Sequence, residues 1–234
     1  MKRNGFSLLE LSIVLIIIGL LTTLVIAAKT LIDSSKVARA VTLTSSSGIN
    51  KEEGLIFWLE TSLLTKENIG TDNIYEWRDI GPYSIVFKNA TTNNLPLRSG
   101  YISGIKAIYF SGYSYYSMDG NPPNLSEYTS FVVSNPDGNT GSIYNSNFKL
   151  KASDVNQNIV IVKNTGEKKY IKEYKNYSFK QMANDDTLDT TSSFFTIGAD
   201  SFKGYIYEII VFDRVLEDKE VAKIEQYLHN KYTK

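Results

Sequence analysis

The sequence of 234 residues predicts an α+β protein, in which a long N-terminal helix precedes an antiparallel β-sandwich and a C-terminal helix. An uncharged apolar run at Leu11–Ala28 predicts the first helix. Short apolar runs separated by turn residues predict the sandwich, and helical spacing after Asp218 predicts the last helix. These patterns place the boundary between the first helix and the head at about residues 47 and 48.

The first helix is predicted to be long enough to cross a bilayer. Between Phe6 and Ala28 the only charged residue is Glu10, and at about 1.5 Å per residue this stretch spans roughly 35 Å. The helical pattern continues to about Leu43, with Lys29 at the expected exit from the membrane. A carboxylate within such an apolar helix is costly, so we expect Glu10 to be functional and to have a partner.

The start of the chain resembles the prepilin signal of type IV pilins and of type II secretion pseudopilins. The resemblance rests on a basic pair at residues 2–3, on Gly5 and Phe6, and on Glu10 ahead of the apolar run. It implies that a prepilin peptidase cuts between Gly5 and Phe6 and methylates the new amino terminus. It also implies that Glu10 pairs with the Phe6 amino group of a neighbouring subunit, since opposite charges lower each other's burial cost. Residues 1–5 would be the leader peptide and residues 6–47 the transmembrane and assembly helix.

Two simpler interpretations of the N-terminus compete. One is an ordinary secretory signal with Val25-Ile26-Ala27 as its cleavage site, but the apolar stretch is long for such a signal and Glu10 would harm it. The other is a plain signal anchor, which explains the apolar run but neither Gly5-Phe6 nor Glu10.

The composition of the chain argues against disulfide bonds and against a general affinity for nucleic acid. The chain has no cysteine, so the head must be held without disulfides. Basic and acidic residues balance at 25 each, which offers no general attraction for nucleic acid.

The head, residues 48–234, is expected to consist of many short strands. The predicted strands are Leu55–Leu59, Ile85–Phe87, Ala107–Phe110, Ser130–Val133, Ile159–Val162, Phe194–Ile197 and Tyr205–Phe212. Polar loops at Asn135–Asn147 and Asn184–Ser193 are expected to be the most mobile. The closing helix, Asp218–Lys231, should bury Val221, Ile224 and Leu228 and use Glu220 to reach back to its start.

Three stretches of the head resemble concanavalin A-like (laminin-G-like) jelly-roll domains. They are residues 54–60 with 74–81, residues 104–112, and residues 197–216 with the closing helix. The resemblance implies a jelly roll with the terminal helix packed on it. Residues 135–158 depart from the pattern because they are short and polar, so one or two strands are expected to be missing there.

The sequence gives little support for an enzyme. Glycosidases of this architecture carry paired carboxylates on one strand, and no predicted strand has them. Glu208 is expected to be a structural carboxylate satisfied by backbone or an arginine, with a catalytic role as the alternative. We interpret Asp185, Asp186 and Asp189 as solvent-exposed charges in a polar loop, and we expect His229 to be a surface residue.

The sequence is compatible with ligand binding by the head. Tyr113, Tyr115 and Tyr116 could stack on sugar rings, although tyrosines at alternating positions also line ordinary strands. Jelly rolls of this type sometimes hold calcium, for which the candidate loop carboxylates are Asp137, Asp185, Asp186 and Asp200. No cofactor is otherwise expected.

These observations leave three functional hypotheses. The first is a pilus subunit or minor pilin, inserted in the bacterial inner membrane before assembly with other pilins into an extracellular filament. The second is a carbohydrate-binding adhesin at a pilus tip, whose partners would be surface glycans. The third is a type II secretion pseudopilin in a periplasmic pseudopilus.

Overall fold

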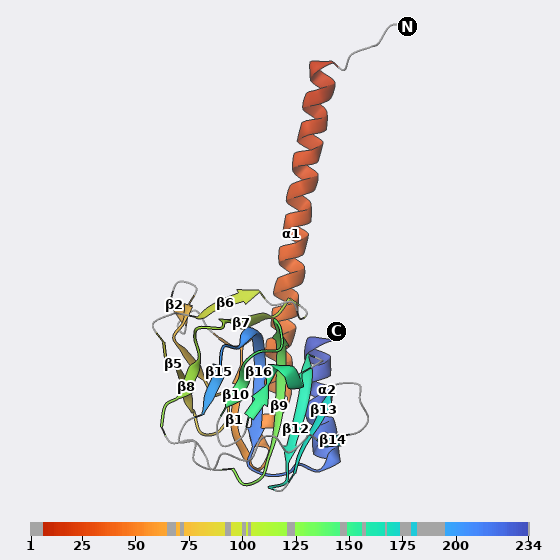
Figure 1. Cartoon of the computed structure of the whole chain (residues 1–234). Helices are drawn as coiled ribbons and strands as arrows, with labels where there is room; N and C mark the ends of the chain where they lie inside the picture. Colours follow the sequence, from red (N-terminus) through yellow and green to blue (C-terminus); the bar gives the residue numbers. More distant parts are fainter. Residues whose placement is uncertain are drawn as a thin grey trace.

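A computed structural model gives the architecture of most of the chain (Figure 1). The structure describes residues 7–64, 69–70, 73–91, 95–99, 102, 104–120, 125–145, 149–155, 158–166, 168–173, 179–181 and 195–233. A single long helix projects from a compact head, its start at the far tip, and the C-terminus lies on the head near the base of that helix (Figure 1).

The projecting helix is α1, Leu8–Ser46, which continues without a break for 39 residues or about 60 Å. Only Ala40 and Thr44 along its length are buried. A short 3-10 turn, η1 (Ile49–Lys51), follows Gly48 and leads into the first strand. The prediction of one continuous helix from the apolar run to about Leu43 is confirmed, with the helix ending at Ser46.

The described part of the head contains two antiparallel sheets and a C-terminal helix. The larger sheet has the strand order β14-β13-β12-β9-β16-β7-β6-β3-β2, with β1 also paired to β16. The smaller has the order β11-β10-β15-β8-β5-β4. The bounds are β1 Leu55–Glu60, β2 Ile69–Gly70, β3 Asn73–Ile74, β4 Glu76–Arg78, β5 Val86–Asn89, β6 Leu95–Ser99, β7 Lys106–Ser111, β8 Tyr116–Met118, β9 Tyr128–Pro136, β10 Ser142–Asn145, β11 Lys149–Lys151, η3 Ala152–Asp154, β12 Ile159–Asn164, β13 Lys169–Glu173, β14 Lys180–Gln181, β15 Thr196–Ala199, β16 Lys203–Phe212 and α2 Asp218–Tyr232.

The head is built in three layers with two cores. One core lies between the sheets and includes Phe57, Phe87 and Phe195, whose rings meet edge to face. The second core lies between the larger sheet and the helices, and joins Ala40 of α1 to Ile224 of α2. The larger sheet is therefore covered on both faces, which explains why its central strands are continuous apolar runs rather than alternating ones.

Every predicted strand corresponds to an observed one, although Phe194 lies outside the described residues. The closing helix is confirmed, with Val221, Ile224 and Leu228 buried and the Glu220 carboxylate accepting the Glu217 N–H at 2.8 Å. The expectation of missing strands within residues 135–158 was wrong. This region supplies β10 and β11, whose apolar residues Ile143, Tyr144 and Leu150 are buried while polar residues surround them. The loop Asn184–Ser193 lies outside the described residues.

Candidate functional site

The tip of α1 carries the carboxylate that the sequence singled out. Ser7 caps the helix: its hydroxyl accepts the Glu10 N–H at 3.2 Å, and Glu10 Oε2 accepts the Ser7 N–H at 2.8 Å. Glu10 is exposed, and both of these hydrogen bonds join it to Ser7 within the first turn of the helix. Gly5 and Phe6, the predicted cleavage and methylation residues, lie outside the described residues.

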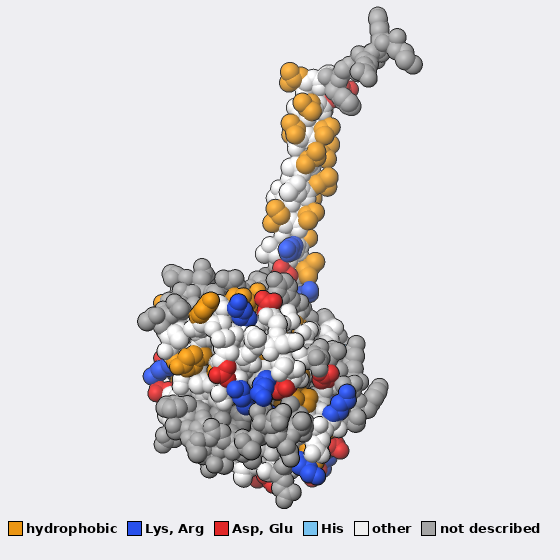
Figure 2. Space-filling model, viewed as in Figure 1, with side chains coloured by type: hydrophobic (Ala, Val, Ile, Leu, Met, Phe, Trp, Pro, Cys, Tyr) orange, Lys and Arg blue, Asp and Glu red, His pale blue; other side chains and the backbone are white. Residues whose placement is uncertain are grey.

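The outer part of α1 exposes its apolar side chains from Leu8 to Ile32, and Figure 2 shows those on one face of the helix. Leu8 is 87% exposed and Leu20, one-third of the way along the helix, is 62% exposed. Its hydroxyl side chains need no outside partner, because Thr22 donates to the Ile18 carbonyl at 2.8 Å and Thr23 to the Gly19 carbonyl at 2.7 Å. Among the described residues this is the one helix long and apolar enough to span a membrane.

The inner end of α1 is fixed to the head by α2. Arg39 donates to the Asn230 carbonyl at 3.0 Å, and the Thr44 hydroxyl lies 3.1 Å from the Tyr227 hydroxyl. Thr44 also accepts a hydrogen bond from the Lys231 ammonium at 2.8 Å. The Thr44 contacts with Tyr227 and Lys231 therefore form a buried polar junction between the helix and the head, whereas the Arg39 contact is exposed.

Two glutamates face each other across the strands at this junction. In the antiparallel pairing of β1 with β16, Glu60 lies opposite Glu208, and both are 1% exposed. Like charges directly opposite each other destabilise a sheet, so the pair needs compensation. The register of β16 with β9 shifts between Ile206 and Glu208, and this bulge turns Glu208 toward the same helix-covered face as Tyr207.

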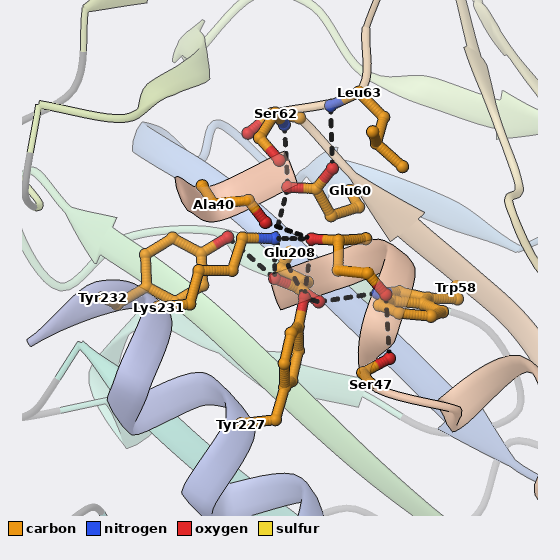
Figure 3. A network of polar contacts seen from close by, with 12 residues as sticks. Ala40, Ser47, Trp58, Glu60, Ser62, Leu63, Glu208, Tyr227, Lys231 and Tyr232 are labelled. Atoms are coloured by element: carbon orange, nitrogen blue, oxygen red, sulfur yellow. Dashed lines mark hydrogen bonds and ion pairs between the residues drawn. The ribbon is translucent and has the colours of Figure 1, made fainter. Parts of the chain in front are cut away.

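Lys231 of α2 supplies the compensation (Figure 3). Its side chain is fully buried, and its ammonium nitrogen lies 2.5 Å from Glu60 Oε1 and 2.9 Å from Glu208 Oε2. It also donates to the Tyr227 hydroxyl at 2.9 Å. We call Glu60, Glu208 and Lys231 the junction triad.

The remaining carboxylate oxygens of the triad are satisfied. Glu208 accepts from Trp58 Nε1 at 2.6 Å and from the hydroxyls of Tyr227 and Tyr232 at 2.8 Å each. Glu60 accepts the backbone N–H groups of Ser62 at 2.8 Å and Leu63 at 2.9 Å. Because buried charges are tolerated only when paired and hydrogen-bonded, this complete set of partners is what permits three ionisable groups in the core.

Burial dominates the electrostatics of the triad. With all three groups ionised the site would hold one excess negative charge. Burial raises the pKa of Glu208, with Lys231 opposing and Glu60 reinforcing that shift. The pKa values of Tyr227 and Tyr232 are raised well above their usual range, chiefly by burial and then by the charge of Glu208, so both stay protonated donors.

The sequence anticipated only part of this junction. Glu208 is a satisfied structural carboxylate as expected, but its cationic partner is a lysine rather than an arginine. His229, which was expected at the surface, is partly exposed, whereas the role of Lys231 was not anticipated and its side chain is buried. Lys231 follows Leu228 by three residues and Ile224 by seven, so helical spacing placed it on the predicted apolar face of α2.

The predicted tyrosine site is divided by the fold. Tyr113 is 76% exposed and Tyr115 is 37% exposed, whereas Tyr116 is in the core with its hydroxyl bonded to the Ile74 carbonyl at 2.7 Å. Tyr116 therefore has no face available to a ligand. Tyr75, 51% exposed, joins the same end of the smaller sheet, because residues 89 and 90 bond to the carbonyls of Tyr75 and Tyr115 at 2.9 and 3.0 Å.

The candidate calcium ligands do not meet in the described part of the chain. Asp200 is committed to Lys149 at 2.8 Å and to the Ser142 hydroxyl at 2.7 Å, and Lys149 lowers the pKa of this carboxyl. Asp137 is exposed in a separate turn, while Asp185, Asp186 and Asp189 lie outside the described residues. No group of three or more acidic or histidine side chains that could hold a metal occurs among the residues the structure describes.

Comparison with known families matches residues 1–26 to the prokaryotic N-terminal methylation motif. The N-terminus is therefore type IV pilin-like, which implies processing by prepilin peptidase and assembly with other pilins. No curated protein matches the chain.

The head is similar to domains of solved glycoside hydrolases. Domain 4 of a GH43 extracellular arabinanase from Geobacillus stearothermophilus, in complex with arabinotriose, is 14% identical with a TM-score of 0.50, covering 74% of this chain and 98% of that one. An arabinofuranosidase complexed with arabinofuranosyl-alpha-1,2-xylobiose is 10% identical with a TM-score of 0.49, covering 68% of this chain and 51% of that one. Trypanosoma rangeli sialidase in complex with sialic acid is 11% identical with a TM-score of 0.47, covering 78% and 34%. At such identities the first similarity shows the fold of the head alone.

Proposed function

We propose that this protein is a type IV pilin-like subunit, a minor pilin or pilus subunit, that polymerises through α1 and displays the head on a filament surface. Peptidase cleavage between Gly5 and Phe6 would release residues 1–5 and make Glu10 the fifth residue of the mature chain. The inner membrane would hold the subunit until assembly. The head would act without catalytic turnover, since Glu208 is enclosed and committed to Lys231.

The observation that carries this proposal is the exposure of α1 along its apolar length. A helix that is apolar on all sides needs lipid or other helices around it, and the head covers only its inner end. In the membrane lipid meets this need, and in a filament the helices of neighbouring subunits meet it. The same surface serves both states, so transfer from membrane to filament requires no refolding of the head.

Glu10 is the element that distinguishes assembly from simple anchoring. A plain anchor gains nothing from a carboxylate in its first turn, whereas a subunit can offer it to a cationic amino terminus beside it. In the single chain the carboxylate is held by the Ser7 N–H, so it is already oriented at the helix tip. Pairing with the Phe6 amino group of a neighbour would replace or add to that bond.

The structure allows the charge of Glu10 to be separated from its capping role. Glu10→Gln keeps a side chain that can accept the Ser7 N–H but removes the charge, and it should prevent appearance of the protein in sheared surface filaments. Ser7→Ala removes the opposite half of the capping box but keeps the carboxylate, and it should still assemble. Both proteins should reach the membrane fraction in wild-type amounts. Wild-type filaments from Glu10→Gln would refute charge pairing.

Location distinguishes a pilus from a secretion pseudopilus. Antibody to the head should label sheared extracellular filaments if the chain is a pilus subunit, along the fibre for a major subunit or at its end for a tip protein. Labelling confined to the periplasm would support the pseudopilin alternative.

Glycan binding is a second candidate function, favoured by the exposed tyrosines at one end of the smaller sheet. Tyr75, Tyr113 and Tyr115 present aromatic surface there, and sugar rings stack on such surfaces. The similar arabinanase domain was solved with arabinotriose, which suggests arabinose oligosaccharides as the first ligands to try. A concanavalin A-like jelly roll would be the architecture behind this role.

A paired substitution tests this candidate. Tyr113→Ala with Tyr115→Ala should abolish retention on a glycan array, while Tyr83→Ala, which removes a tyrosine that is 65% exposed in another turn, should not. Absence of any glycan bound by the wild-type chain, or equal binding by both variants, would leave the head without a lectin role at this surface.

A further inference from the structure

The junction triad places the groups of an amide-forming reaction together in a closed, water-poor site. An amine nucleophile, a carboxyl carbon and a second carboxylate must meet, and here Lys231, Glu60 and Glu208 do so with no exposed side chain among them. The aromatic side chains of Trp58, Tyr227 and Tyr232 surround them.

We propose that Lys231 and Glu60 condense to an intramolecular amide bond, with Glu208 moving the protons. The Nζ–Cδ bond forms, one C–O bond of Glu60 breaks, and a water molecule leaves. Two of the three ammonium protons depart with that oxygen and the third stays on the amide nitrogen. The net charge of the triad is the same before and after, and no oxidant or other reactant is required.

The assignment of Glu60 as electrophile follows from its contacts. Glu60 Oε1 and Glu208 Oε2 both contact the ammonium, so their other hydrogen-bond donors distinguish the two carboxylates. The backbone N–H groups of Ser62 and Leu63 point at the two oxygens of Glu60, at 2.8 and 2.9 Å, where they can stabilise negative charge on the tetrahedral intermediate. Among the described residues, the groups that donate to Glu208 are side chains.

Glu208 is suited to the proton-transfer role. Its Oε2 lies 2.9 Å from Nζ, within reach of the proton that must leave before the amine can attack. Burial raises the pKa of its carboxyl, so it can hold that proton before passing it to the departing oxygen. Condensation also replaces a buried ion pair by a neutral amide, which removes part of the burial cost of the charges, and the fixed contact gives the two groups a high effective concentration.

The bond would join the two ends of the head. Glu60 ends β1, the first strand after α1, and Lys231 lies in the last turn of α2, 171 positions later in the chain. Pulling force entering along α1 would pass through the amide into α2 and bypass the chain between them. In a head without cysteine, this bond would do what a disulfide does elsewhere.

Whole-chain mass spectrometry tests the proposal directly. The full chain, purified from membranes in detergent, should weigh one water less than its sequence and N-terminal processing require. Trypsin should release a branched peptide joining residues 52–66 to residues 224–234, because the chain is no longer cut after Lys231. The variants Lys231→Met and Glu208→Gln should have the full mass. As a control, Lys223→Met removes another lysine of α2, an exposed one that is paired with Glu52, and this variant should still weigh one water less than its sequence requires.

Three results would overturn the proposal. A wild-type chain of full mass, with separate peptides 52–66 and 224–231, would make the triad an ion-pair cluster only. A branch to residues 204–214 would show that Glu208 is the electrophile, and normal mass loss in Glu208→Gln would remove its role in proton transfer. The wild-type measurement decides the existence of the bond even if a variant fails to fold, and none of these results depends on filament assembly.

Discussion

The exposed apolar part of α1 at residues 8–32, which we call the stalk, and the junction depart in opposite ways from the usual rule that apolar side chains are buried and charged ones exposed. The outer part of α1 exposes leucine, isoleucine and valine along its length, whereas the junction encloses two glutamates and a lysine. At the junction every charge has its partner within the same chain. Along the stalk the chain supplies no cover for its apolar surface, so that cover must come from lipid or from other subunits.

This difference separates two tasks. The junction fixes the direction in which α1 leaves the head, because Thr44 on the helix and Lys231 on α2 belong to one hydrogen-bonded network. The stalk remains open to exchange one apolar environment for another. Substitutions at the junction should therefore change the stability of the isolated protein, and substitutions along the stalk should change only its assembly.

Removing the central cation should have the largest effect on the isolated protein. Lys231→Met leaves Glu60 and Glu208 facing each other without compensation, and it should lower the free energy of unfolding by about 3–5 kcal/mol. Denaturant unfolding of the full chain in detergent, followed by tryptophan fluorescence, measures this. Lys223→Met, at an exposed pair on the same helix, should cost less than about 1 kcal/mol. Equal effects from the two substitutions would contradict the account of the junction.

Separating α1 from the triad should have an intermediate effect. Thr44→Val keeps the shape of the side chain but removes the hydroxyl that Lys231 and Tyr227 contact, which should cost about 1.5–3 kcal/mol. Hydrogen exchange should rise at the inner end of α1 more than in β16. Uniform destabilisation of the whole head would instead mean that the contact does not specifically hold the helix.

The pH dependence should report on Glu208. Because burial raises its pKa above 4.5 in the folded chain, the native state holds more protons than the unfolded state just above that pH. Its contribution to stability is therefore complete below pH 4.5 and is lost as pH rises through the folded-state pKa, by at most about 1.4 kcal/mol for each pH unit. The groups that face it are Glu60, Lys231, Tyr227 and Tyr232.

Glu208→Gln should flatten this dependence in unfolding measurements between pH 4.5 and neutrality. Asp79 has a pKa raised by burial as well and would leave a residual slope of the same sign. Stability that increases with pH in the wild type over this range would contradict the assignment.

A change in the stalk should have the smallest effect on the isolated protein. Leu20→Ala removes a side chain that is 62% exposed, so the free energy of unfolding of the head should change by less than about 0.5 kcal/mol. The same substitution should reduce the amount of protein in sheared filaments, since it removes apolar contact between subunits. A clear loss of head stability would mean that the stalk and head are not separate in the way described.

Sequence reasoning predicted the elements with strong local signals. The long apolar helix and the strands β1, β9, β12 and β16 follow from continuous apolar runs, and the face of α2 with Val221, Ile224 and Leu228 follows from helical periodicity. It missed β10 and β11 because two or three buried residues among polar ones are too few to establish a period. The structure shows why β15 contains Gly198, since its φ is +75° and a Cβ there would meet the ring of Phe110 at 2.0 Å.

The junction could not be predicted from local pattern. Glu60, Glu208 and Lys231 are brought together by the pairing of β1 with β16 and by the docking of α2, which are contacts between distant segments. The assignment of Tyr116 to a glycan site was wrong for a related reason. Of the tyrosines at residues 113, 115 and 116, it alone is fully buried. Which of them points inward becomes clear only once β8 is known to face the other sheet. Glu10 was found from sequence because its signal, a single carboxylate in an apolar run, is local.

The absence of cysteine provides the most direct test of the central claim, that the stalk is an assembly surface. Leu20→Cys and Tyr113→Cys would each introduce the only thiol in the chain, one on the stalk and one on the head. Both should react with a maleimide in detergent-solubilised protein, since both positions are exposed. In intact sheared filaments, Tyr113→Cys should still react and Leu20→Cys should be protected by neighbouring helices. Equal reaction of Leu20→Cys in filaments and in detergent would show that the stalk is not covered on assembly and would contradict the proposed function.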